Sequence, residues 1–209
     1  MAEVKICGLS EPVSLQVALD QGADFVGLVF YDESPRNVSV MQACTLADQA
    51  RGKAKIVALV VDADDGFLRQ VARELRPDFI QAHGSETPER IAAIHDLTKI
   101  PVIKAVKIES AGDVLESLAF GMVANMLLFD AKAPKGLLPG GNGLSFDWRL
   151  LKGVTGRYML SGGLTPDNVG AAVALTRAPI VDVSSGVETS PGVKNAELIA
   201  KFIKAAKSA

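Results

Sequence analysis

Eight short apolar runs, spaced almost evenly along the chain, constrain its fold more than any other feature. The runs are mostly apolar rather than alternating, which is typical of strands buried on both faces of a parallel sheet. The predicted strands are Val4–Cys7, Phe25–Phe30, Lys55–Val60, Phe79–Ala82, Val102–Val106, Met126–Phe129, Tyr158–Ser161 and Ile180–Val183.

Helical patterns lie between these strands. Ser10, followed by Glu11 and Pro12, predicts a helix that Ser10 caps and that stops at Gly22. The same kind of helix start is predicted at Thr165, Pro166 and Asp167, before a helix at Asn168–Leu175. Further helix starts are expected at Asp64, Thr87 and Asn195, and Cys44 falls in a helix expected at Met41–Gln49.

Strands that alternate with helices predict an α/β protein. Eight units in 209 residues give roughly 26 residues per unit, close to the minimum for a (β/α)₈ TIM barrel. An open, doubly wound sheet is the alternative, but eight units favour closure. No linker or change in composition divides the chain, so residues 1–209 are expected to form one domain. The Gly- and Pro-rich stretch from Ala131 to Ser145 is long enough to be a lid, or else a disordered insertion.

Composition excludes several classes of protein. A net charge of −2 offers no global basic field for nucleic acid, and no apolar run approaches the roughly 18 residues of a membrane helix. The N-terminus lacks the apolar core of a signal peptide. Two cysteines are too few for a disulfide framework. We therefore expect a cytoplasmic protein that binds neither nucleic acid nor membrane.

Two reactive side chains stand at strand ends, where parallel α/β proteins place their chemistry. Cys7 ends the first strand, and Asp130 follows the apolar residues of the sixth. A thiolate and a carboxylic acid in one pocket can act as a base and an acid. The structural alternatives are an inert buried cysteine and an aspartate that caps a helix or forms a salt bridge in a loop.

The ends of the last two predicted strands carry residues suited to phosphate. In barrels, the loops after strands seven and eight often bind phosphate through backbone N–H groups. Glycines leave those amides open, and serine hydroxyls add donors. The predicted phosphate residues are Gly162, Gly163, Ser184, Ser185 and Gly186.

Two further side chains could face the same pocket. Arg36, in the loop after the second strand, could bind a carboxylate or lie solvated on the surface, and His83 ends the fourth strand. A metal centre is poorly supported, because His95 is expected to be exposed on a helix and leaves one pocket histidine. The acidic run from Asp62 to Asp65 lacks the glutamate of a calcium loop.

In their order along the chain, these residues resemble the phosphoribosylanthranilate isomerase family of tryptophan biosynthesis. The resemblance implies a (β/α)₈ barrel that catalyses an Amadori rearrangement of a phosphorylated aminoaldose without metal or organic cofactor. It is carried by Lys5–Gly8, Phe30 with Ser34–Arg36, Gln81–Gly84, Phe129–Ala131, Gly140–Gly143 with Phe146–Trp148, Ser161–Leu164, and Asp182–Glu188 with Pro191–Lys194.

The resemblance also implies a role for each residue. Asp130 would be the general acid that opens the ribose ring, and Cys7 the general base that removes the C2′ proton. Arg36 would hold the anthranilate carboxylate, and the glycine and serine loops the 5′-phosphate. His83 and Asp182 would contact the sugar or the aromatic ring.

Three rival functions remain. A histidine-pathway isomerase that performs the same rearrangement would use two aspartates, one of them at the end of the first strand. Here the first strand ends in Cys7 instead. A metal-dependent pentose-phosphate epimerase would need more histidines in the pocket. A non-catalytic barrel that senses a sugar phosphate would need neither Cys7 nor Asp130.

Overall fold

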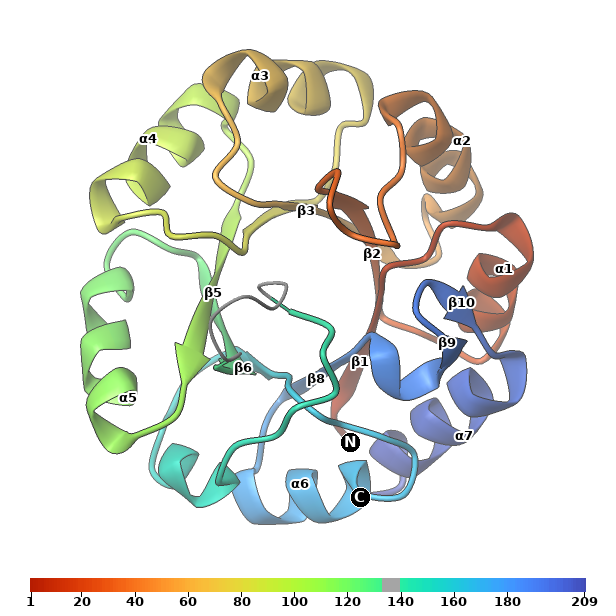
Figure 1. Ribbon diagram of the computed structural model, residues 1–209, viewed down its shortest axis with the longest axis vertical. Helices are drawn as coiled ribbons and strands as arrows, with labels where there is room; N and C mark the ends of the chain where they lie inside the picture. Colours follow the sequence, from red (N-terminus) through yellow and green to blue (C-terminus); the bar gives the residue numbers. More distant parts are fainter. Residues whose placement is uncertain (133–139) are drawn as a thin grey trace.

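Eight parallel strands close into a barrel in a computed structural model of the chain, which describes residues 1–132 and 140–209. Each strand pairs with the next along the chain, and β8 returns to pair with β1. Figure 1 looks down this barrel, with the helices in an outer ring. The strands are β1 (Glu3–Cys7), β2 (Phe25–Phe30), β3 (Lys55–Val60), β4 (Phe79–Ala82), β5 (Val102–Ile108), β6 (Met126–Ala131), β7 (Tyr158–Leu160) and β8 (Ile180–Val183).

The prediction of a closed (β/α)₈ barrel is confirmed, and four strands have the predicted bounds. The outer ring consists of α1 (Pro12–Asp20), α2 (Val40–Ala50), α3 (Asp65–Glu74), α4 (Pro88–Thr98), α5 (Ala111–Ser117), α6 (Val169–Thr176) and α7 (Ala196–Lys207). Three short 3₁₀ helices add η1 (Leu118–Phe120), η2 (Trp148–Leu151) and η3 (Ser185–Val187), and a small antiparallel hairpin pairs β9 (Glu188–Ser190) with β10 (Val193–Lys194).

Side-chain caps start three helices where the sequence predicts them. Asp64 accepts a hydrogen bond from the N–H of Phe67, Thr87 from that of Arg90, and Asn195 from that of Leu198. Each cap satisfies a backbone donor that the first helical turn leaves unpaired.

The predicted starts of α1 and α6 are each wrong by one residue. Glu11, and not Ser10, precedes α1, because Pro12 occupies the first helical position and holds the residue before it in an extended conformation. Asn168 precedes α6 rather than starting it, and its side-chain oxygen accepts a hydrogen bond from the N–H of Thr165.

Every second residue of a strand points into the barrel, and this alternation decides which side chains reach the site. The inner side chains in the lower part of the barrel are apolar: Phe25, Val57, Ile103, Ala105, Met126, Leu128, Met159 and Ile180. Two residues further along several strands, toward their carboxyl ends, the inward positions become polar. Lys5, Gln81, Asp130 and Asp182 are all buried there.

Within the described ranges, no helix is long and apolar enough to cross a membrane. The predicted lid between Ala131 and Ser145 lies partly outside the described residues, since 133–139 are not among them. Its described end, from Gly140 to Leu144, lines cavities at the carboxyl ends of the strands.

Candidate active site

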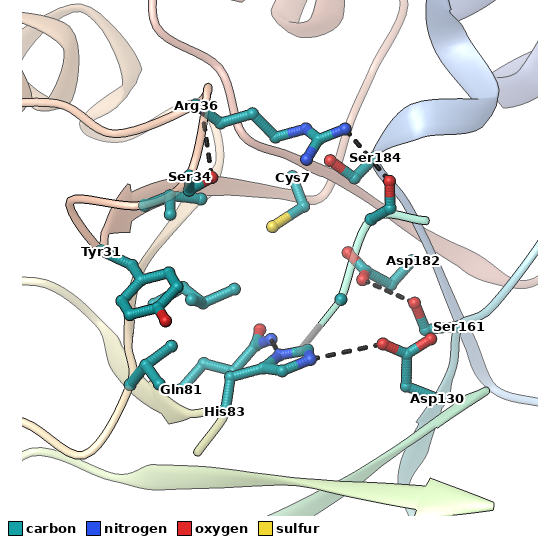
Figure 2. Close-up of a pocket in the computed structure, with 15 residues that line it drawn as sticks. Cys7, Tyr31, Ser34, Arg36, Gln81, His83, Asp130, Ser161, Asp182 and Ser184 are labelled. Atoms are coloured by element: carbon teal, nitrogen blue, oxygen red, sulfur yellow. Dashed lines mark hydrogen bonds and ion pairs between the residues drawn. The ribbon is translucent and has the colours of Figure 1, made fainter. Parts of the chain in front are cut away.

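A pocket opens at the carboxyl ends of the strands, and several predicted site residues line it (Figure 2). Cys7 enters from β1 and Asp130 from β6, on different sides of the cavity. The pocket is lined by Cys7, Val29, Tyr31, Ser34, Arg36, Leu59, Val61, Gln81, His83, Asp130, Gly140, Gly141, Ser161, Asp182 and Ser184. The barrel therefore brings a thiol and a carboxyl group to one cavity, as predicted.

Cys7 is 4% exposed and lies close to three charged groups. Burial raises the pKa of the Cys7 thiol, and the negative charge of Asp182 raises it further. The positive charges of Lys5 and Lys194 oppose both effects. Burial has the largest effect, so the pKa of Cys7 is raised and the thiol holds its proton more tightly than an exposed cysteine does.

Asp130 faces a histidine whose ring is fixed by a glutamine. The Asp130 carboxyl Oδ2 lies 3.3 Å from His83 Nε2, and its Oδ1 accepts a hydrogen bond from the N–H of Ala131. Gln81 Nε2 lies 2.9 Å from His83 Nδ1 (Figure 2). The Gln81 amide donates to Nδ1, so Nε2 is the ring nitrogen that carries the N–H facing Asp130.

Gln81 and His83, which line the cavity, each have one polar side-chain atom without a hydrogen bond. Among the described residues, Gln81 Oε1 and His83 Nε2 are buried and make no hydrogen bond of good geometry. Buried polar atoms without partners are costly, so both are suited to a polar ligand or water in the pocket. His83 therefore lines the pocket just after β4, as the sequence predicts.

Asp182 does not present a free carboxylate. Its Oδ1 accepts a hydrogen bond from Lys5 Nζ at 2.8 Å, and its Oδ2 accepts one from Ser161 Oγ at 3.0 Å. Lys5 and Ser161 have no assigned role in the sequence prediction. The signal for Lys5 was its position two residues before Cys7, which places both on the same face of β1.

Arg36 is buried rather than solvated at the surface, and its side chain is already engaged. Its Nε and Nη2 donate to Glu188 Oε1 and Oε2 at 2.8 and 2.7 Å, and Nη2 also lies 3.3 Å from the carbonyl oxygen of Gly141. Lys194 Nζ donates to Glu188 Oε1 at 2.6 Å and to the carbonyl of Ser184. Glu188 therefore binds the Nε and Nη2 edge of the Arg36 guanidinium, leaving Nη1 on the side of Gly141.

The glycine and serine loops after β7 and β8 meet in a second cavity beside the first. All five predicted phosphate residues line it, together with Asn142, Gly143 and Leu144. Gly162 and Gly163 have φ values of +88° and +63°, a conformation that favours glycine. These two glycines therefore shape the turn after β7 that lines this cavity.

Other candidates lie away from these cavities. Cys44 is on α2, and His95 is on α4, where it is partly buried rather than exposed as predicted. Asp64 caps α3, as already described. Across residues 1–132 and 140–209, no group of three or more histidine, cysteine or acidic side chains could hold a metal ion.

Known proteins match the whole chain. The family model described as N-(5′-phosphoribosyl)anthranilate isomerase matches residues 4–205. An N-(5′-phosphoribosyl)anthranilate isomerase of Afipia carboxidovorans is 51% identical, with 99% of this chain and 89% of the relative covered. One of Nitrobacter hamburgensis is 52% identical, with 99% and 93% covered.

Solved structures agree in fold over the full length. The phosphoribosylanthranilate isomerase of Thermotoga maritima superposes with a TM-score of 0.90 at 34% identity and full coverage of both chains. A phosphoribosylanthranilate isomerase in complex with reduced 1-(o-carboxyphenylamino)-1-deoxyribulose 5-phosphate gives a TM-score of 0.87 at 32% identity, again with full coverage. With these matches to its sequence and fold, the chain belongs to the N-(5′-phosphoribosyl)anthranilate isomerase family.

Proposed function

We propose that the protein converts N-(5′-phosphoribosyl)anthranilate to 1-(2-carboxyphenylamino)-1-deoxyribulose 5-phosphate, an aldose–ketose isomerisation of tryptophan biosynthesis, by general acid–base catalysis. Family membership supports the reaction. The observation that carries the roles is that Cys7 and Asp130 line one cavity, while the glycine and serine loops line the adjoining one.

Asp130 is proposed as the general acid. In this role it donates a proton to the ribose ring oxygen as the bond from that oxygen to C1′ breaks. The nitrogen lone pair then forms the C1′=N⁺ bond of an iminium ion. His83 Nε2, 3.3 Å from Asp130, is placed to orient this carboxyl group or to contact the sugar.

Cys7 is proposed as the general base. Its thiolate removes the proton from C2′, and the electrons of that C–H bond form a C1′=C2′ double bond as the iminium is neutralised. The enolamine then tautomerises: C1′ gains a proton, and the C2′ hydroxyl loses one to become the ketone. No covalent bond between enzyme and substrate is required.

The remaining residues would bind substrate. Arg36 would bind the anthranilate carboxylate through the part of its guanidinium that Glu188 does not hold. Gly162, Gly163, Ser184, Ser185 and Gly186 would bind the 5′-phosphate, and Asp182 would contact the sugar or the ring. We also propose that the protein acts in the cytoplasm, a reducing compartment in keeping with Cys7 and Cys44, which are both free thiols.

The test follows the loss of substrate fluorescence on conversion of phosphoribosylanthranilate. Cys7→Ser and Asp130→Asn are each expected to lower kcat by roughly 10²- to 10⁴-fold, the usual contribution of general acid or base catalysis. Both variants should still bind the reduced product. Cys44→Ser, which changes the thiol outside the pocket, is the matched control and should leave kcat unchanged.

Normal turnover by either site variant would contradict the role assigned to that residue. Tight binding of the reduced product without turnover by the wild-type protein would instead indicate a barrel that senses a sugar phosphate.

A further inference from the structure

A lysine is buried inside the barrel directly before the proposed base. Lys5 is 0% exposed and belongs to the largest fully buried side chains of the described residues. A lysine ammonium is rarely buried completely, because removing the charge from water is costly unless a partner compensates for it. A buried ammonium at this position therefore requires a partner of opposite charge inside the barrel.

Lys5 and Cys7 occupy the same small space. They are two residues apart on β1, so both side chains point into the barrel. Gly27 on β2 faces them: a methyl group built there would lie 2.8 Å from Cys7 Sγ and 3.2 Å from Lys5 Nζ. The sulfur and the ammonium thus approach each other in the space that this glycine leaves open.

Asp182 and Ser161 hold the ammonium in place. Asp182 Oδ1 accepts a hydrogen bond from Lys5 Nζ at 2.8 Å, and Ser161 Oγ donates to the other carboxylate oxygen. The Lys5 side chain is completely buried and that of Asp182 is 5% exposed, so solvent screens this pair little. Lys5 cannot turn away from Cys7 without breaking the pair.

Other charged or titratable side chains lie around the pocket that Cys7 lines. The positive charge of Lys194, on β10, acts to lower the pKa of Cys7. Arg36, His83 and Asp130 line the same pocket from the loop after β2, from the end of β4 and from β6. Val29 on β2 and Leu59 on β3 pack against Cys7 and are uncharged. The Lys5 ammonium is the charged group that lies with the Cys7 sulfur in the space beside Gly27.

We propose that Lys5, held by Asp182, is a positioning residue whose ammonium charge stabilises the thiolate of Cys7 and so prepares it to remove the substrate proton. The inference rests on the proposed role of Cys7 as the base. Asp182 also acts on Cys7 directly. Its negative charge destabilises the thiolate and so opposes part of the effect of Lys5.

The pKa directions agree with this geometry. Burial raises the pKa of Cys7, and Lys5 opposes that rise more than any other neighbour. For Lys5, burial favours loss of the proton, but Asp182 and Cys7 outweigh it and raise the pKa to about 12. Lys5 therefore stays charged while Cys7 titrates, as a residue that stabilises a thiolate must.

The test measures the ionisation of Cys7 directly, in a Cys44→Ser background that leaves one thiol. The rate of alkylation by iodoacetamide is followed against pH. Its midpoint reports the thiol pKa, and its plateau at high pH reports access of the reagent. Lys5→Met should move the midpoint to higher pH and slow alkylation about tenfold at pH values below it, with the plateau unchanged. Lys201→Met, an exposed lysine of α7, is the matched control and should move neither.

Asp182→Asn should have the opposite effect and speed alkylation severalfold below the midpoint. Adding Lys5→Met to Asp182→Asn should reverse that gain, which isolates the effect of the ammonium should Lys5→Met alone fail to fold. An unchanged midpoint in a folded Lys5→Met protein, or in the double variant compared with Asp182→Asn, would overturn the inference.

The same variants separate the inference from the proposed function. If Cys7 is the base, the acid limb of kcat/KM should move with the alkylation midpoint. A midpoint that moves while the acid limb does not would support the coupling of Lys5 to Cys7 and would contradict Cys7 as the base.

Discussion

At the scale of single residues, several charged side chains of the site are buried and paired with one another. Arg36, Glu188 and Lys194 form one group, and Lys5 with Asp182 forms another. Groups paired in this way hold fixed positions, so little reorganisation is needed when substrate binds. The arrangement makes each member sensitive to loss of its partner, because the remaining charge stays buried.

Glu188→Gln should therefore destabilise the protein. It leaves Arg36 and Lys194 without a carboxylate, and we expect a loss of about 3 kcal/mol in the free energy of unfolding at pH 7, measured with urea. The exposed pair of Arg73 and Glu74 supplies the control, since Glu74→Gln should produce no measurable change. A loss no larger than that of the control would show that the buried group contributes nothing to stability.

The difference between wild type and Glu188→Gln should also depend on pH. Burial alone would raise the pKa of Glu188, but Arg36 and Lys194 outweigh it and lower the pKa. A carboxyl group whose pKa is lowered on folding stabilises the protein above its unfolded pKa of about 4.3, and that contribution is lost as pH falls through the folded value. The two proteins should therefore become more alike in stability below about pH 4.

At the scale of elements, side-chain caps and special backbone positions decide where helices begin and end. The N-caps of α3, α4 and α7 are local, because each involves residues three apart. The C-terminal ends of α4 and α6 have a less favourable backbone conformation. Lys99 and Arg177 follow these helices in the left-handed conformation, at φ +60° and +56°. Residues other than glycine adopt that conformation at a cost.

Lys99→Gly should relieve this cost and stabilise the protein by about 0.5–1 kcal/mol in urea unfolding. Lys99 is exposed and its contact with Asp96 is long, at 3.7 Å, so little else is lost. As the control, Lys201→Gly in the middle of α7 should destabilise by about 1 kcal/mol, because glycine is unfavourable inside a helix. If both substitutions destabilised equally, the backbone conformation at Lys99 would not be the reason.

At the scale of the whole molecule, the chain closes on itself twice. The last strand, β8, pairs with β1, and α7 packs against β1 and α1, so the two ends of the chain lie in one sector of the barrel (Figure 1). The inner face of α7 is buried and includes Ile199, Phe202 and Ile203. Because Cys7 and Lys5 are on β1, closure also supports the site.

Phe202→Ala should test how much this closure contributes. Phe202 is completely buried, and removing its ring should cost about 3–5 kcal/mol in the free energy of unfolding. Leu175→Ala, on the outer face of α6 and 47% exposed, should cost about 0.5 kcal/mol or less. Similar losses for both would mean that α7 is not tightly packed on the barrel.

Much of the fold and part of the site could be predicted because their signals are local. Apolar runs gave eight strands in their order, and parallel strands place Cys7, His83 and Asp130 at one end of the barrel. The expected gathering of Gly162, Gly163, Ser184, Ser185 and Gly186 in one cavity agrees with the same reasoning. Their roles toward substrate stay predictions.

The sequence by itself determined which strands form and which side chains stand at their ends, because both depend on residues a few positions apart. Only the tertiary structure decided which charges pair. Arg36 meets Glu188 across 152 positions, and Lys5 meets Asp182 across 177. No local pattern encodes such contacts, since they exist only after the barrel has closed. That closure binds Arg36 to a carboxylate of the protein and places a buried ammonium beside Cys7.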